Sequence, residues 1–202
     1  MSLLDALTQQ LGGQNLSALA GQLGLDENQT SSAISAALPM MIQAMNRNTN
    51  SQDGAASFAN ALDNDHDGGI LNNLGDFFAS PDNGAGPGIL KHLFGEKRGQ
   101  VEQGIGQMAN INPQAAGGLL ENLAPVVMGF LGQQKRQQGL DIGGIASLIG
   151  GFTGQAQQGG SNSSAAMNLL NGILDQDGDG SIIDDIGGGL LKNLFGGRRN
   201  RR

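Results

Sequence analysis

The stretch QLGLDENQTSSAISAALPMMIQAM, residues 22–45, indicates a turn followed by a long amphipathic helix. Asp26 is a residue type that caps helices, because its side chain can accept a hydrogen bond from the first-turn backbone. Pro39 lies inside the helical pattern and removes one backbone donor, so we expect a kink or a split there. Apolar residues recur at three- and four-residue spacing and define one buried face, made by Ile34, Ala37, Leu38, Met41 and Met45.

The same pattern returns at residues 107–131, QMANINPQAAGGLLENLAPVVMGFL. Asn112 is the expected cap, Pro113 takes the first helical position, and Pro125 lies 86 residues after Pro39. Its apolar stripe consists of Leu119, Leu120, Leu123, Val127 and Phe130. Because no convincing alternating strand pattern is found elsewhere, the sequence predicts an all-α protein with short helices and glycine-rich joints.

Two further segments occur twice. LDNDHDGGILNNLGDF (62–77) resembles LDQDGDGSIIDDIGGG (174–189), and GILKHLFG (88–95) resembles GLLKNLFG (189–196). Self-similarity of this kind indicates repeated structural units. We therefore predict two tandem helical units, 1–96 and 97–196, each of about 100 residues. The second unit has a Gly/Gln/Ser-rich insertion near 132–164, and a basic tail follows at 197–202.

Each acidic segment resembles the start of an EF-hand calcium loop. In such a loop, positions 1, 3 and 5 carry oxygen ligands, position 6 is glycine, and position 7 offers a backbone carbonyl. An apolar residue at position 8 can anchor the loop to the core. The candidate ligands are Asp63, Asp65, Asp67 and Gly69 in the first loop, and Asp175, Asp177, Asp179 and Ser181 in the second.

Both loops lack the glutamate that closes an EF-hand loop at position 12, where Leu74 and Ile186 stand instead. In the second loop, Asp184 and Asp185 could turn back towards the ion and bring the carboxylates to five. Neighbouring carboxylates repel one another, and a bound cation removes that repulsion. We therefore expect calcium to bind, and more tightly at the second loop. The alternative is an acidic, glycine-containing turn that holds no metal.

The composition of the chain excludes several kinds of site and disfavours one class of partner. The 202-residue chain contains no Cys, Trp or Tyr, so disulfides, zinc-thiolate sites and cysteine nucleophiles are excluded. Its net charge is −7 although four arginines lie in the tail (Arg198, Arg199, Arg201 and Arg202), and this acidity disfavours nucleic acid as a partner. Glycine is abundant, at 35 residues, and small residues allow close helix contact. We expect a homo-oligomer.

The sequence contains few signs of catalysis or of targeting to a compartment. No nucleophile motif or phosphate-binding loop is seen, so we expect a protein that is not an enzyme. The opening MSLLDALTQQ lacks the features of a secretory signal, which makes the cytoplasm the default location. Signal-less export and envelope association stay open as alternatives. The Leu-Phe segments, 89–94 and 190–195, each present one apolar face. We expect this face to dock on the core; a membrane surface is the less favoured alternative.

The repeated acidic segments, together with the upstream LP and AP helices, resemble a bacterial family of unknown function that includes the YidB-like proteins. In that family, a helical repeat leads to an aspartate-rich D-x-D-G-S-I-x-D-D segment. The resemblance implies a mainly helical bacterial protein and supplies no activity. The first copy departs from the motif, because Asn72 and Asn73 stand where the paired acids belong.

From these residues we expect a non-enzymatic, calcium-binding, self-associating structural protein. The alternative is a peripheral membrane or envelope-associated protein that uses the Leu-Phe helices and the arginine tail.

Overall fold

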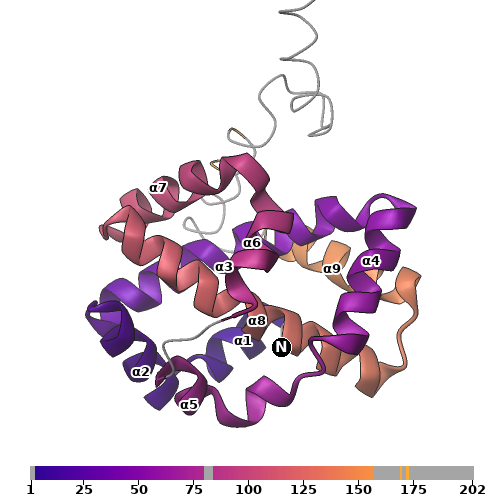
Figure 1. Cartoon of the computed structure of the whole chain (residues 1–202), viewed down its shortest axis with the longest axis horizontal. Helices are drawn as coiled ribbons and strands as arrows, with labels where there is room; N and C mark the ends of the chain where they lie inside the picture. Colours follow the sequence, from indigo (N-terminus) through magenta and orange to yellow (C-terminus); the bar gives the residue numbers. More distant parts are fainter. Residues whose placement is uncertain (1–2, 80–83, 157–168, 170–171, 173–202) are drawn as a thin grey trace, which may run out of the picture.

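The computed structural model describes residues 3–79, 84–156, 169 and 172 (Figure 1). Within these residues the chain is helical and forms no strand, which confirms the all-α prediction. The elements, in chain order, are α1 (Leu3–Gln10), α2 (Gln14–Leu23), α3 (Glu27–Thr49), α4 (Gln52–Asn64), η1 (Gly69–Asn73), α5 (Leu74–Ala79), α6 (Gly86–Phe94), η2 (Gly95–Lys97), α7 (Arg98–Ala109), α8 (Pro113–Gln138) and α9 (Ile142–Ala156).

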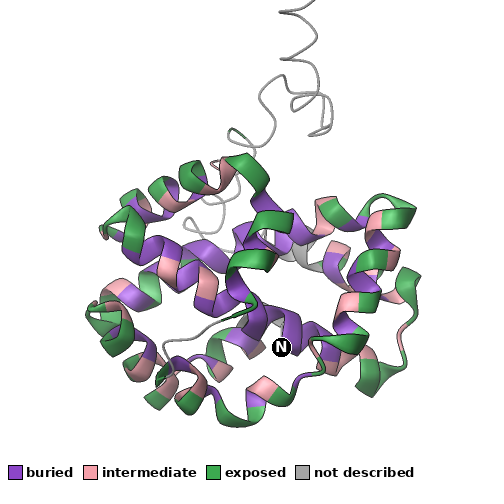
Figure 2. Cartoon of the chain, in the orientation of Figure 1, coloured by how far each residue is buried: buried purple, intermediate pink, exposed green. Residues whose placement is uncertain are grey.

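The two long helices, α3 and α8, contact each other and form the centre of the packing. The shorter helices surround this pair, so that α4 and α6 contact both long helices, and the buried residues line the inner faces (Figure 2). One hydrophobic core cluster includes residues before and after position 96. The predicted boundary between the two units is therefore not a boundary between two separate cores in the described part of the chain.

The helix caps predicted at the start of α3 and α8 are confirmed. The Asp26 carboxylate accepts a hydrogen bond from the Gln29 backbone N–H at 2.8 Å, and the Gln29 side chain accepts one from the Asp26 N–H at 3.3 Å. The Asn112 side chain accepts a hydrogen bond from the Ala115 N–H at 2.8 Å. Each cap satisfies a donor that would otherwise lack an intrahelical partner.

The turns before the two caps also have the same geometry. Gly24 and Asn110 adopt left-handed backbone conformations, with φ of 66° and 53°. The next residue in each turn, Leu25 or Ile111, donates its backbone N–H to a carbonyl of the helix that has just ended, at 3.0 and 2.9 Å. Two turns 86 residues apart therefore end one helix and start the next in the same way.

Neither proline splits its helix, because α3 and α8 continue through Pro39 and Pro125. Both prolines are buried, and packing from the surrounding helices outweighs the loss of one hydrogen bond in each. By length and hydropathy, α8 is the one described helix that could cross a membrane. Most of it is buried among the other helices, as expected for the central helix of a core.

Two sequence features contribute to the core. The insertion predicted near 132–164 contains α9, whose Ile145 and Ile149 are buried, and α9 packs on α3 and α4. The first Leu-Phe segment forms α6 and buries Leu90, Leu93 and Phe94, in agreement with the expected docking on the core. The second Leu-Phe segment, 190–195, and the arginine tail lie outside the described residues.

Candidate functional site

The first acidic loop makes the sharp turn that the calcium-loop pattern predicts. Asp63 belongs to the last turn of α4, and Asp65 is the residue that caps this helix. Gly68 has a φ of 88°, a left-handed conformation that favours glycine. The Asp67 side chain accepts a hydrogen bond from the Gly69 N–H at 2.8 Å, and η1 begins at once. The backbone therefore reverses at the expected glycine.

The loop docks against α8 at two glycines. A methyl group on Gly132 would overlap the backbone oxygen of His66, so this contact requires glycine. A methyl group on Gly129 would lie 2.7 Å from a side-chain carbon of Ile70. Ile70 is partly buried against the core, as expected for the apolar residue at position 8. Neither glycine was predicted from the sequence, although their three-residue spacing within an apolar helix could have indicated a close contact.

Two of the loop's three aspartates are paired with cations from α8. Lys135 forms a salt bridge with Asp63, and Arg136 lies 3.7 Å from a carboxylate oxygen of Asp67. The pKa of Asp67 is lowered, first by the hydrogen bond from the Gly69 N–H and then by the charge of Arg136. The positive charge that the acidic loop requires is therefore supplied in part by the protein.

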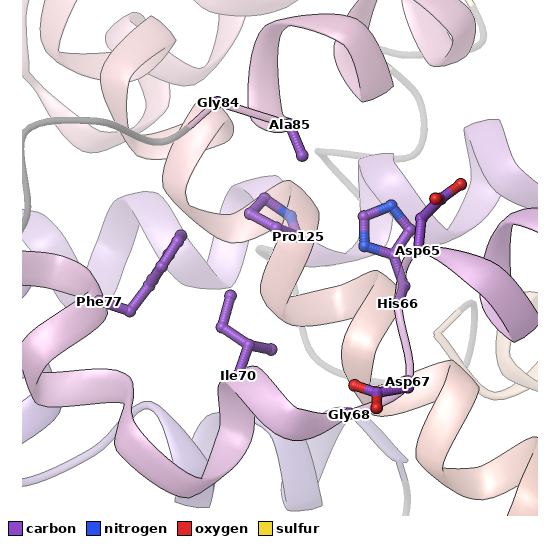
Figure 3. Close-up of a pocket in the computed structure, with 9 residues that line it drawn as sticks. All are labelled: Asp65, His66, Asp67, Gly68, Ile70, Phe77, Gly84, Ala85 and Pro125. Atoms are coloured by element: carbon purple, nitrogen blue, oxygen red, sulfur yellow. The ribbon is translucent and has the colours of Figure 1, made fainter.

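This arrangement does not gather the first set of candidate ligands around one centre. The carboxylates of Asp65 and Asp67 point in different directions (Figure 3). Asp63 is still part of α4 and faces Lys135. Within the described ranges, no three His, Asp or Glu side chains are placed to hold a metal ion. In this conformation the candidate ligands Asp63, Asp65, Asp67 and Gly69 belong to a turn in which Asp63 and Asp67 are ion-paired with α8.

The second set of candidate ligands lies outside the described residues. This set consists of Asp175, Asp177, Asp179, Ser181, Asp184 and Asp185. Their role in binding calcium stays a prediction from the sequence.

Two cavities meet at the first loop and share Asp65, His66 and Ala85. The smaller has a volume of about 200 Å³ and lies between the loop, Phe77 and Pro125 of α8 (Figure 3). The larger has a volume of about 660 Å³ and lies between α4 and α6.

His66 borders both cavities, and His92 borders the larger one. Burial lowers the pKa of His66, and the nearby charge of Asp65 opposes this effect. No sequence pattern pointed to a partner for either histidine, because their common cleft arises only when α4 and α6 pack against α8.

In the part of the chain that the structure describes, fold and site together define a helical protein with a central helix pair and an acidic loop docked on one helix of that pair. The chain belongs to the family described as bacterial protein of unknown function (DUF937), whose family model matches residues 5–134. That range includes the first acidic loop and ends before the second. No curated protein and no solved structure matches the chain. The bacterial family predicted from the sequence is thus confirmed, and the YidB-like subgroup stays a prediction.

Proposed function

We propose that the protein is a non-enzymatic structural protein of two tandem helical units, whose two acidic loops have different roles. In this proposal, the role of the first loop is structural, because it holds the end of α4 against α8. The second loop is EF-hand-like and binds calcium. The observation that carries the proposal is the pairing of Asp63 and Asp67 with Lys135 and Arg136.

The basic pair on α8 argues against tight calcium binding at the first loop. Lys135 is largely buried, with 14% of its side chain exposed, so its ammonium group is held beside the loop. A divalent cation placed among the same aspartates would be repelled by both basic side chains. It would also have to displace the salt bridge to Asp63.

The second loop differs in its charge. Its sequence carries five carboxylates against three in the first loop. The long helices correspond with an offset of 86 residues, which places Thr49 and Asn50 where α8 has Lys135 and Arg136. The first long helix therefore carries no basic pair that could do for the second loop what Lys135 and Arg136 do for the first. Calcium, which prefers oxygen ligands in flexible loops, would supply the missing positive charge.

The proposal is tested by thermal unfolding of the full chain in millimolar calcium and in chelator. Two double variants, Asp63→Asn/Asp67→Asn and Asp175→Asn/Asp179→Asn, change the net charge equally and so control for charge alone. We expect calcium to raise the unfolding temperature of the parent chain and of the first variant, but not of the second. An unfolding temperature that calcium leaves unchanged in all three proteins would refute calcium binding.

Self-association belongs to the same proposal. Each bound calcium removes two negative charges from an acidic chain and so lowers the repulsion between copies. Because linkage is reciprocal, assembled protein should bind calcium more tightly than the monomer. Light scattering across a calcium series at fixed ionic strength should therefore rise with calcium. Scattering that follows ionic strength and ignores calcium would oppose this part of the proposal.

Peripheral membrane association is the second candidate function. It is favoured by the apolar segment 190–195, which is followed directly by the arginine-rich tail. The first Leu-Phe segment supports it less, because α6 buries its apolar face in the core. Sedimentation with anionic liposomes should pull down the chain if this function holds. A variant with the four tail arginines changed to glutamine should then stay in solution.

A further inference from the structure

The cleft between α4 and α6 has the properties of a ligand site. Its volume of about 660 Å³ falls within the range of small-molecule pockets, roughly 300–1,000 Å³. Phe58 of α4, Ile89 and Leu93 of α6, and Met128 of α8 provide apolar surface in the cleft. Methionine adapts its shape readily, which suits a surface that accepts an apolar chain. The apolar part of a ligand would therefore find matching surface from three helices.

The charge around the cleft selects the polar end of that ligand. Asp65 lies at the rim, and no lysine or arginine is among the described residues that line the cleft. Its neighbours Asp63 and Asp67 are paired with Lys135 and Arg136, whereas no described side chain forms a salt bridge with Asp65. Figure 3 shows the Asp65 carboxylate directed away from that of Asp67. An ammonium group at the rim would meet this carboxylate, whereas a ligand carboxylate would be repelled.

We propose that this cleft binds a small amphipathic amine, with its apolar chain against Ile89, Leu93 and Met128 and its ammonium group at Asp65. His66, at the same end of the cleft, has its pKa lowered by burial and so adds little competing positive charge at neutral pH. The proposal rests on described residues alone and requires no calcium at either acidic loop, so its outcome is independent of the proposed function.

The head group is tested with three probes of equal chain length: octylamine, octanol and octanoate. Each is titrated into the full chain, and binding is followed by the methyl NMR signals of Ile89, Leu93 and Met128. We expect saturable shifts with octylamine, weaker ones with octanol, and none with octanoate. Equal shifts with all three probes, or no shift with octylamine, would overturn the assignment of an amine.

Asp65→Asn tests the ion pair. Because Asp65 is exposed, we expect its loss to weaken octylamine binding about two- to fivefold and to leave octanol binding unchanged. Glu96→Gln is the matched control, since it removes an exposed acid that does not line the cleft. An equal loss of affinity in the two variants would mean that the acidic chain attracts amines without a site, and would overturn the proposal.

Gly88→Leu tests the location. Gly88 lines the cleft, and a Cβ atom there would meet nothing within 4 Å, so we expect leucine to fill the cleft without disturbing the fold. Gly99→Leu is the control, because Gly99 also lies exposed near the start of a helix with open space around it but does not line the cleft. We expect at least a tenfold loss of octylamine affinity in Gly88→Leu alone. Unchanged binding in Gly88→Leu would place the amine elsewhere and overturn the proposal.

Discussion

Gly132 fixes where the first acidic loop can lie, because the backbone of His66 approaches α8 at a point where any side chain would intrude. The next glycine towards the helix start, Gly129, gives similar room to Ile70. A glycine within a helix normally costs stability, so its presence at a close contact is explained by the packing. Because of these two glycines, the acidic turn can pack directly against α8.

We predict that Gly132→Ala lowers the free energy of unfolding by about 1–3 kcal/mol, since the new methyl group would overlap a backbone oxygen that cannot rotate away. Gly151→Ala is the matched control. It is an exposed helical glycine with nothing within 4 Å, so alanine should raise stability by up to about 1 kcal/mol. Urea unfolding of the two variants measures both effects. A Gly132→Ala variant as stable as the parent would show that the loop is not held against α8.

His66 gives a second prediction at the residue scale. Its pKa is lowered in the folded protein, so the unfolded chain binds more protons at slightly acidic pH. The free energy of unfolding should therefore fall as the pH decreases from 6.5, the ordinary pKa of histidine, towards the lowered pKa of His66 in the folded protein. His66→Gln should flatten this dependence between about pH 7.5 and pH 5. His92→Gln leaves His66 as the one histidine of the chain and should keep the slope; loss of the slope in His92→Gln would contradict the assignment.

At the scale of the elements, the two long helices begin in the same way. Their caps and the preceding left-handed residues depend on a few neighbouring residues in the sequence. This is why Asp26, Asn112 and the starts of α3 and α8 could be predicted. The effect of the two prolines was harder to predict, since it depends on how firmly the rest of the protein holds each helix. That information is not local.

We predict that Asp26→Ala and Asn112→Ala each cost about 1 kcal/mol of stability. The cost should be larger at Asp26, because its charged carboxylate also favours the positive end of the helix, whereas the Asn112 amide is neutral. Asn28→Ala, at an exposed position beside the cap, should change stability by less than about 0.5 kcal/mol. Urea unfolding measures all three, and an equal effect at positions 26 and 28 would exclude a capping role for Asp26.

The candidate site shows the limit of sequence reasoning at this scale. The turn at Gly68 and the anchor at Ile70 follow from a local pattern and were expected. The pairing of Asp63 with Lys135 joins residues on two helices far apart in the sequence, and no local pattern indicates it. The carboxylates were therefore expected to converge on a metal, whereas α8 already provides positive charge for two of them. The cleft beside His66 was missed for the same reason.

For the whole molecule, the described helices share one core that joins the two predicted units. An internal repeat thus does not imply separable domains here, because α7 and α8 pack directly on α3. The two acidic loops differ in charge, with three carboxylates in the first and five in the second. We propose that the first loop serves internal packing and that the second binds calcium.

Calorimetric titration of calcium into the full chain tests this assignment most directly. We predict about one calcium per chain, which is the number expected if one of the two acidic loops is occupied. Binding should persist in Asp63→Asn/Asp67→Asn and be lost in Asp175→Asn/Asp179→Asn. Two calcium ions per chain, or loss of binding when the first loop is changed, would contradict the account.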